Sequence, residues 1–179
     1  MTDISDDAPP TTRKNVSHDQ SMTAVAVTIA RPASELYDYF RDFSKLPTFM
    51  ENVVRVEKLD DTRSHWEVKA PAGQTVEWTS TVTTDEPGRR IGWQSDPDAD
   101  VENSGTVEFA DAGARGTVVT ATIAYDPPAG AIGKLVAKMF QREPAIQARR
   151  DLRRFKQLME TGEVATAAMT VAQHEKEDR

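Results

Sequence analysis

The chain has 179 residues, of which 38% are hydrophobic and 28% are charged, with a formal net charge of −7 and no cysteine. This length and composition are typical of one soluble globular domain with tails. The negative charge disfavours nonspecific nucleic-acid binding, and the lack of cysteine excludes disulfides, thiolate metal sites and cysteine nucleophiles.

Residues 1–21 are rich in Asp, Pro, Thr and Ser and hold few large apolar side chains. We expect them to form a disordered tail, because they bury too little surface to offset the entropy lost on ordering. They also lack the apolar core of a secretory signal. No uncharged run in the chain exceeds 11 residues, short of the about 20 residues that cross a bilayer. These features predict a cytoplasmic protein.

The folded domain is predicted to span residues 22–160 and to begin with a half-buried strand. The signal for this strand is the alternation of Val25, Val27 and Ile29 with smaller or polar residues. Two short helices follow, the second of them around residues 43–50. The first has an apolar face made by four residues at helical spacing: Leu36, Tyr39, Phe40 and Phe43.

Six further strands are predicted by alternating apolar patterns that are separated by turn residues. They cover residues 53–59, 64–69, 75–83, 91–95, the surroundings of 107–109, and 117–125. The short, hairpin-like spacings indicate a mostly antiparallel sheet. The prediction is therefore an α+β domain with about seven strands.

A long helix is predicted from about residue 131 to residue 160, with a kink at Pro144, which cannot donate to the helical ladder. Residues 131–159 carry eight Lys or Arg against two acidic residues, whereas residues 22–130 carry ten basic and eighteen acidic residues. We interpret the basic helix face as a charged surface in water. The alternative is a docking face for an anionic membrane or a protein partner. Residues 161–179 are expected to be a flexible tail.

Metal and catalytic motifs are weak. His65 is the only histidine of the predicted domain, which argues against a zinc site or a histidine-based triad. An acidic run at residues 96–100 resembles the start of a calcium loop, but Val101 and Val107 stand where that loop needs Gly and Glu. No carboxylate is placed on the predicted apolar faces. We therefore predict no metal and no cofactor, and assign no catalytic residue.

Aromatic side chains gather on the predicted inner faces of the strands. They fit either ordinary core packing or the lining of a cavity for an apolar ligand. The candidate pocket residues, including part of the helix stripe, are Trp66, Trp78, Trp93, Phe109, Tyr125, Val136, Met139 and Phe140.

Several short motifs occur in a moderately specific order and spacing. They are RPASELYDYF at 31–40, DF at 42–43, LP at 46–47, IGW at 91–93, GTVEF at 105–109, GTVV at 116–119 and YDPP at 125–128. With the strand at 53–59, this arrangement resembles the START-like superfamily, also called SRPBCC. Within it, the chain looks like the polyketide cyclase/dehydrase and coenzyme-Q-binding branch. The resemblance covers nearly all of residues 22–160.

The resemblance implies a helix-grip fold, in which a curved antiparallel sheet wraps around a long C-terminal helix with a hydrophobic cavity between them. Members of this family carry lipids, isoprenoid quinones or polyketides, and some catalyse cyclisation or dehydration of polyketides. We expect a monomer or weak dimer that binds a hydrophobic small molecule. A cyclase or dehydrase is the alternative, and a docking module that uses the basic helix is a second alternative.

Overall fold

The computed structural model describes residues 11–14, 21–99, 101–126 and 144–164. Within these ranges, eight strands form one sheet in the order β1-β2-β8-β7-β6-β5-β4-β3, and all neighbours run antiparallel. The strands are β1 (Thr11–Lys14), β2 (Ser21–Ile29), β3 (Val53–Lys58), β4 (Arg63–Lys69), β5 (Thr75–Glu86), β6 (Arg90–Ser95), β7 (Glu102–Asp111) and β8 (Thr117–Asp126). The helical elements are α1 (Ala33–Arg41), η1 (Phe43–Thr48), η2 (Pro71–Gly73), η3 (Gly113–Arg115) and α3 (Pro144–Thr161).

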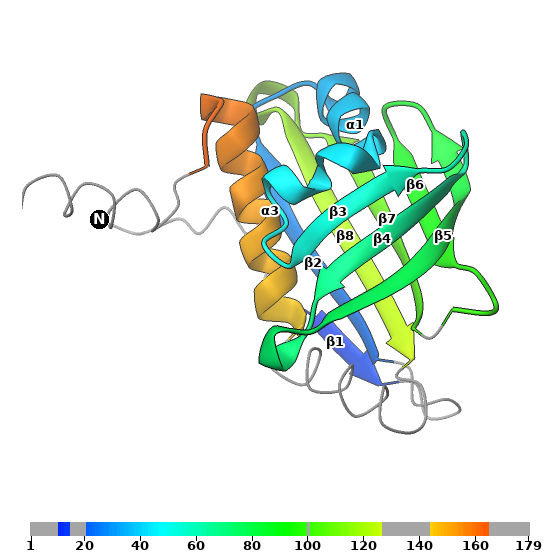
Figure 1. The fold of residues 1–179 in the computed structure, drawn as a ribbon. Coiled ribbons are helices and arrows are strands. Elements are labelled where there is room, and N and C mark those ends of the chain that lie inside the picture. The colour runs from blue at the N-terminus through cyan, green and yellow to red at the C-terminus, as the bar shows by residue number, and fades with distance from the viewer. Residues whose placement is uncertain (1–10, 15–20, 100, 127–143, 165–179) are drawn as a thin grey trace, which may run out of the picture.

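The sheet is strongly curved, and α3 lies along β2 (Figure 1). The elements α1 and η1 cross one end of the sheet, where η1 contacts β3 and α1 contacts β6 and β7. The predicted α+β fold, an antiparallel sheet that grips a C-terminal helix, is confirmed. The predicted start of that helix at 131–143 lies outside the described residues.

The sequence predicted a disordered tail before residue 22, and this was wrong for β1. Residues 11–14 pair with β2 from Thr11 opposite Ala24 to Lys14 opposite Ser21. The four residues read TTRK and have no apolar alternation, so their sequence carries no signal for a strand. The pairing instead follows from the free backbone groups that β2 presents at the edge of the sheet. A short, basic outer strand also makes that edge a poor template for other chains.

The core begins with the alternation in β2. Val25, Val27 and Ile29 are each no more than 2% exposed. Across the ladder, Val27 lies opposite Val119 of β8, and both side chains add to the same buried cluster. The turn that leads into β8 requires Gly116, whose φ of 96° is left-handed. A Cβ at this position would overlap the backbone of β2, so only glycine lets the two strands approach here.

The helix α3 is fixed to the sheet at its C-terminal end. The Nζ of Lys156 donates to the carbonyl oxygen of Thr28 at 2.6 Å, and the Nε of Arg31 donates to the carbonyl oxygen of Met159 at 2.7 Å. The backbone N–H of Ala30 donates to Glu160 at 2.7 Å. These bonds hold the end of β2 against the last turns of α3. None of the helices in the described ranges is both long and apolar enough to cross a membrane.

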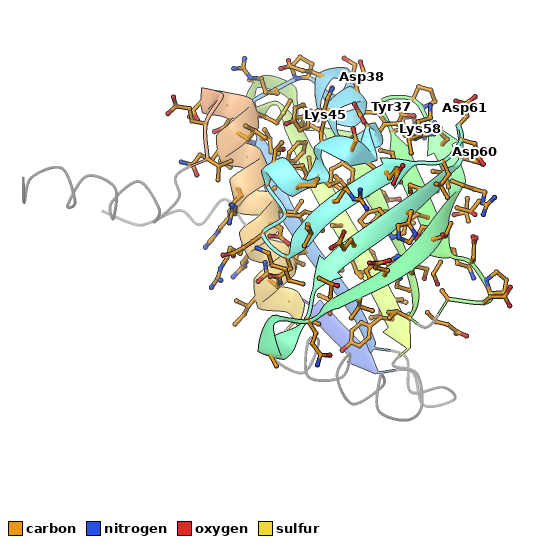
Figure 2. All side chains as sticks on the ribbon, in the orientation of Figure 1. Tyr37, Asp38, Lys45, Lys58, Asp60 and Asp61 are labelled. Atoms are coloured by element: carbon orange, nitrogen blue, oxygen red, sulfur yellow. The ribbon has the colours of Figure 1, made fainter. Side chains whose placement is uncertain are left out.

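Charged side chains gather at the end of the domain that carries α1 and the β3–β4 turn (Figure 2). Asp60 closes that turn by accepting hydrogen bonds from the backbone N–H groups of Thr62 at 2.9 Å and Arg63 at 2.8 Å. On α1, the hydroxyl of Tyr37 donates to Asp85 of β5. Burial and the bond to Asp85 raise the pKa of Tyr37 to about 12. Tyr37 is therefore a neutral structural donor at physiological pH.

Candidate ligand-binding pocket

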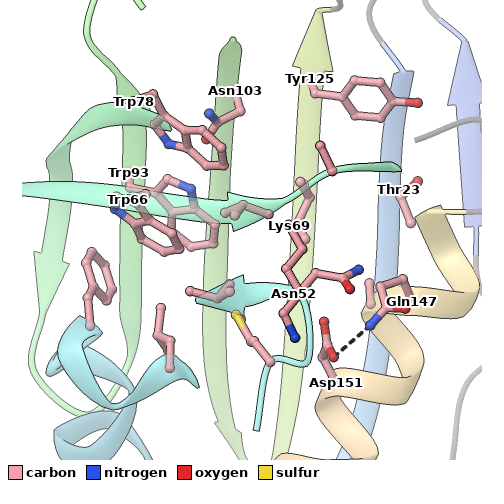
Figure 3. A pocket seen from close by; sticks show the side chains of 18 of the residues that line it. Thr23, Asn52, Trp66, Lys69, Trp78, Trp93, Asn103, Tyr125, Gln147 and Asp151 are labelled. Carbon is pink, nitrogen blue, oxygen red and sulfur yellow. Dashed lines mark hydrogen bonds between the residues drawn. The ribbon is translucent and has the colours of Figure 1, made fainter. Parts of the chain in front are cut away.

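A cavity of about 390 Å³ lies between the sheet, η1 and α3. This volume falls within the range of small-molecule sites, which is roughly 300–1,000 Å³. The cavity has two unlike sides (Figure 3). Indole rings from β4, β5 and β6 form one side, and polar side chains that include Asn52, Lys69, Gln147 and Asp151 lie on the other.

The aromatic side is built around two parallel indoles. The rings of Trp66 and Trp78 lie 6.1 Å apart with an interplanar angle of 11°, because the two residues face each other across β4 and β5. Each indole N–H is already bonded: Trp66 donates to Ser64 at 2.9 Å, and Trp78 donates to Ser80 at 3.1 Å. With their N–H groups satisfied, the rings present apolar π surfaces to the cavity.

Trp93 and Phe43 complete the aromatic side. The ring of Phe43 lies 5.5 Å from that of Trp66 and 6.2 Å from that of Trp93. Trp93 lies flat over Gly105, its partner on β7, and a Cβ at Gly105 would overlap the indole ring. The absence of a side chain at this position therefore sets how deep the indole of Trp93 can lie.

The polar side is centred on Asp151 of α3. Its Oδ1 accepts a hydrogen bond from the Nε2 of Gln147 at 3.0 Å and one from the backbone N–H of Glu51 at 3.4 Å. Burial raises the pKa of Asp151 to about 6, although these bonds and the charge of Arg154 act in the opposite direction. Near neutral pH this carboxyl therefore exchanges between its neutral and its charged form.

Thr23 of β2 also lines the cavity, but its hydroxyl is buried. Its side chain is among the buried polar groups of the protein, with 2% exposure, and its Oγ1 has no hydrogen-bond partner. Buried hydroxyl groups are rarely left unpaired, because the unpaired state costs about 1–3 kcal/mol. The Oγ1 of Thr23 has less than 1 Å² of accessible surface, so it is closed off from the cavity even though the residue lines it.

Of the candidate pocket residues, four line the cavity: Trp66, Trp78, Trp93 and Tyr125. Phe109 shares their strand phase but lies under α1, with ring distances of 6.0 Å to Tyr37 and 6.3 Å to Phe40. It packs in the core and does not line the cavity. The helix candidates Val136, Met139 and Phe140 lie outside the described residues.

Sequence reasoning missed Asp151 and Thr23. It placed no carboxylate on an apolar face, and this was wrong, because Asp151 lies beside Ala148 and Leu152 on α3 and lines the cavity. Thr23 shares the phase of Val25 in β2, and this signal was sufficient to place it inward. His65 lies on the opposite face of β4 from Trp66 and pairs with Glu77 at 3.2 Å. Among the described residues, no group of three or more His, Cys, Asp or Glu side chains could hold a metal ion.

A family model described as polyketide cyclase / dehydrase and lipid transport matches residues 29–153. The chain belongs to this family. The matched segment runs from the end of β2 into α3, so it includes most of the cavity wall. As a member of the polyketide cyclase / dehydrase and lipid transport family, the chain is a ligand-binding domain.

Two similar proteins differ in sequence identity to the chain and in how much of it they cover. An uncharacterized 17.2 kDa protein from Streptomyces lincolnensis is 29% identical over 84 residues, which are 47% of this chain and 55% of that protein. The chain thus aligns with about half the length of this relative. The crystal structure of DR_A0006 from Deinococcus radiodurans is 46% identical, with a TM-score of 0.64 over 79% of this chain and 98% of that one.

The Zhui aromatase/cyclase from Streptomyces sp. R1128 shares the fold of this chain. Its TM-score is 0.63 over 82% of this chain and 99% of that one, at 17% identity. At this identity the similarity shows the fold alone.

Proposed function

We propose that the protein binds a flat, hydrophobic small molecule against the indole side of the cavity. The observation that carries this proposal is the parallel pair of Trp66 and Trp78, whose N–H groups are bonded to serines and whose ring faces are apolar. Flat ring systems stack favourably on such surfaces. A cavity of about 390 Å³ suits a ligand of a few fused rings. The family suggests lipids, isoprenoid quinones and polyketides as ligand classes, and of these the quinones and the ring-bearing polyketides are flat.

Replacing Trp78 with leucine should weaken the binding of a flat apolar probe about tenfold. Leucine keeps an apolar side chain at the site but removes the flat surface on which the probe stacks. The loss of stacking and of contact area should cost about 1.4 kcal/mol of binding free energy, which corresponds to a factor of ten. The measurement is calorimetric titration of the purified protein with 2-methylnaphthalene. The control is Phe109→Leu, an aromatic residue on β7 that is buried outside the cavity, which should leave the affinity unchanged.

Two results would contradict this proposal. The first is a wild-type protein that shows no saturable binding of 2-methylnaphthalene. The second is an equal loss of affinity in Phe109→Leu, which would trace the effect to the general stability of the sheet instead of the cavity wall.

One observation favours a second function, dehydration or cyclisation of the bound molecule. Asp151 lines the cavity, and its pKa of about 6 lets it donate a proton near neutral pH. The Zhui protein, which shares this fold, is an aromatase/cyclase by name. In this function the carboxylate of Asp151 would take the α-proton of a β-hydroxy ketone and pass it to the β-hydroxyl group, which leaves as water as the carbon–carbon double bond forms.

The dehydration function predicts turnover of a simple β-hydroxy ketone, 4-hydroxy-4-phenylbutan-2-one. Its conjugated product can be followed by ultraviolet absorbance. The rate should fall at least ~100-fold in Asp151→Asn, which keeps the shape of the side chain but cannot act as an acid. The control Asp38→Asn changes a carboxylate on α1, outside this cavity, and should keep the wild-type rate. If the wild-type protein binds the ketone without turnover, the binding function stands alone.

A further inference from the structure

The carboxyl group of Asp151 is hydrogen-bonded through one of its two oxygens only. Its Oδ1 accepts from the Nε2 of Gln147 at 3.0 Å and from the backbone N–H of Glu51 at 3.4 Å. Its Oδ2 accepts no hydrogen bond from the described residues, and it is not among the unpaired side-chain atoms there that are closed off from solvent. Figure 3 shows this carboxyl pointing from α3 into the cavity. A bound molecule can therefore reach Oδ2.

The negative charge of Asp151 has no ion-pair partner in the described part of the chain. The nearby Arg150 and Arg154 pair with Glu51 instead, at 3.9 Å and 3.6 Å. Lys69 lines the same cavity, but it is exposed to solvent, where its charge is screened. Burying a carboxylate is costly unless a positive group pairs with it. A positively charged group on the ligand would supply this missing partner.

The opposite side of the cavity also accepts a cation better than an anion. Trp66, Trp78 and Trp93 border the cavity with their indole rings, and the electron-rich face of an indole attracts a positive charge. The chain as a whole has a net charge of −7, and this field raises the local concentration of cations. A carboxylate on the ligand, in contrast, would be repelled by Asp151.

We infer that the ligand of this cavity is an aromatic amine, whose flat ring lies against the indoles and whose protonated nitrogen donates to Oδ2 of Asp151. This inference rests on the proposed binding function and adds a positively charged nitrogen to the flat ring that this function requires. Asp151 is then a specificity-determining residue, because a carboxylate bonds more strongly to an ammonium group than to a neutral group of the same size.

The test compares two ring compounds that differ in one group, naphthalen-2-ylmethanamine and naphthalen-2-ylmethanol, by calorimetric titration at pH 8. The amine is protonated at this pH, and the alcohol has the same shape without the charge. The wild-type protein should bind the amine roughly tenfold more tightly than the alcohol, which is the effect of one hydrogen bond between charged groups.

Asp151→Asn keeps the shape of the side chain but removes its charge, so this variant should bind the two compounds about equally. Asp38→Asn is the matched control, because it removes the same charge from α1, outside this cavity. It should keep the preference for the amine. If Asp38→Asn loses the preference as well, the net charge of the protein selects the amine, and the assignment to Asp151 is wrong.

The preference for the amine should also depend on pH. Because the amine pairs with the ionised carboxyl, its affinity should be highest above the pKa of Asp151, about 6, and should fall toward that of the alcohol at pH 5. The charged groups that face Asp151 are Glu51, which precedes β3, Arg154 of α3, and Lys69 of β4. The pH dependence should disappear in Asp151→Asn. A dependence that persists in this variant would assign it to Glu51 and overturn the role of Asp151.

The outcomes separate this inference from the proposed function. If the wild type binds neither of these compounds nor 2-methylnaphthalene, the binding function itself fails. If it binds 2-methylnaphthalene but binds the amine no more tightly than the alcohol, the binding function stands and the amine is wrong. The amine is also wrong as a partner of Asp151 if Asp151→Asn keeps the preference.

Discussion

Replacing Phe155 with alanine is expected to lower the free energy of unfolding by about 3–5 kcal/mol. Phe155 is fully buried on α3, and its ring lies 4.6 Å from Phe49, 5.7 Å from Phe40 and 6.0 Å from Tyr39. Truncation would leave a cavity where three elements meet. Since these rings join α3 to α1 and to the end of η1, the helix would lose its aromatic contacts with that part of the domain.

Chemical denaturation of the wild type and of Phe155→Ala, followed by circular dichroism, measures this effect. The control Ile146→Ala truncates an apolar residue on the same helix that is 50% exposed, and it should change the free energy of unfolding by less than about 0.5 kcal/mol. Equal effects of the two truncations would mean that helix propensity, and not the aromatic cluster, decides the stability of α3.

Replacing Asp151 with asparagine should stabilise the protein at pH 8 and leave its stability unchanged at pH 3. Burial raises the pKa of this carboxyl from 3.8 to about 6 in the folded protein, so the folded state binds the proton more tightly than the unfolded state. The free energy of unfolding therefore falls as the pH rises from about 4 to about 6. Asparagine stays neutral and can still accept from Gln147 and from the N–H of Glu51. The gain in the free energy of unfolding above pH 6 is at most about 3 kcal/mol, which is the free energy that corresponds to a pKa shift of about two units.

The measurement is the difference in free energy of unfolding between wild type and Asp151→Asn across pH 3–8. Asp60 provides a control of opposite sign, since hydrogen bonds from the backbone N–H groups of Thr62 and Arg63 lower its pKa. Asp60→Asn should destabilise the protein at neutral pH, and this loss should shrink as the pH falls through the pKa of Asp60. A flat difference for Asp151→Asn would show that its carboxyl is as well solvated in the folded protein as in the unfolded chain.

The fold followed from local patterns, because strand alternation and helical spacing depend on neighbours in sequence. The same alternation placed Trp66, Trp78 and Trp93 on the inner face. It could not separate these indoles from Phe109, because strand phase tells which face a side chain occupies and not which element covers that face. In the structure α1 covers Phe109 with Tyr37, while the tryptophans border the cavity.

The two residues that sequence reasoning missed in the cavity wall, Thr23 and Asp151, differ in how far the sequence could have shown them. Thr23 carries a readable signal in the phase of β2. Asp151 carries none, since its burial depends on how α3 lies against the backbone of Glu51, 100 residues away in sequence. The strand β1 was also out of reach, because it pairs through backbone groups whose availability only the completed sheet reveals.

All three tryptophans of the chain border one cavity. The tryptophan emission of this protein therefore originates at this cavity, with no background from indoles elsewhere. Because the rings of Trp66 and Trp78 are nearly parallel and 6.1 Å apart, excitation energy passes readily between them. A flat guest that settles against these rings would perturb the coupled pair as one unit. The protein thus contains a built-in optical reporter of occupancy that needs no attached dye.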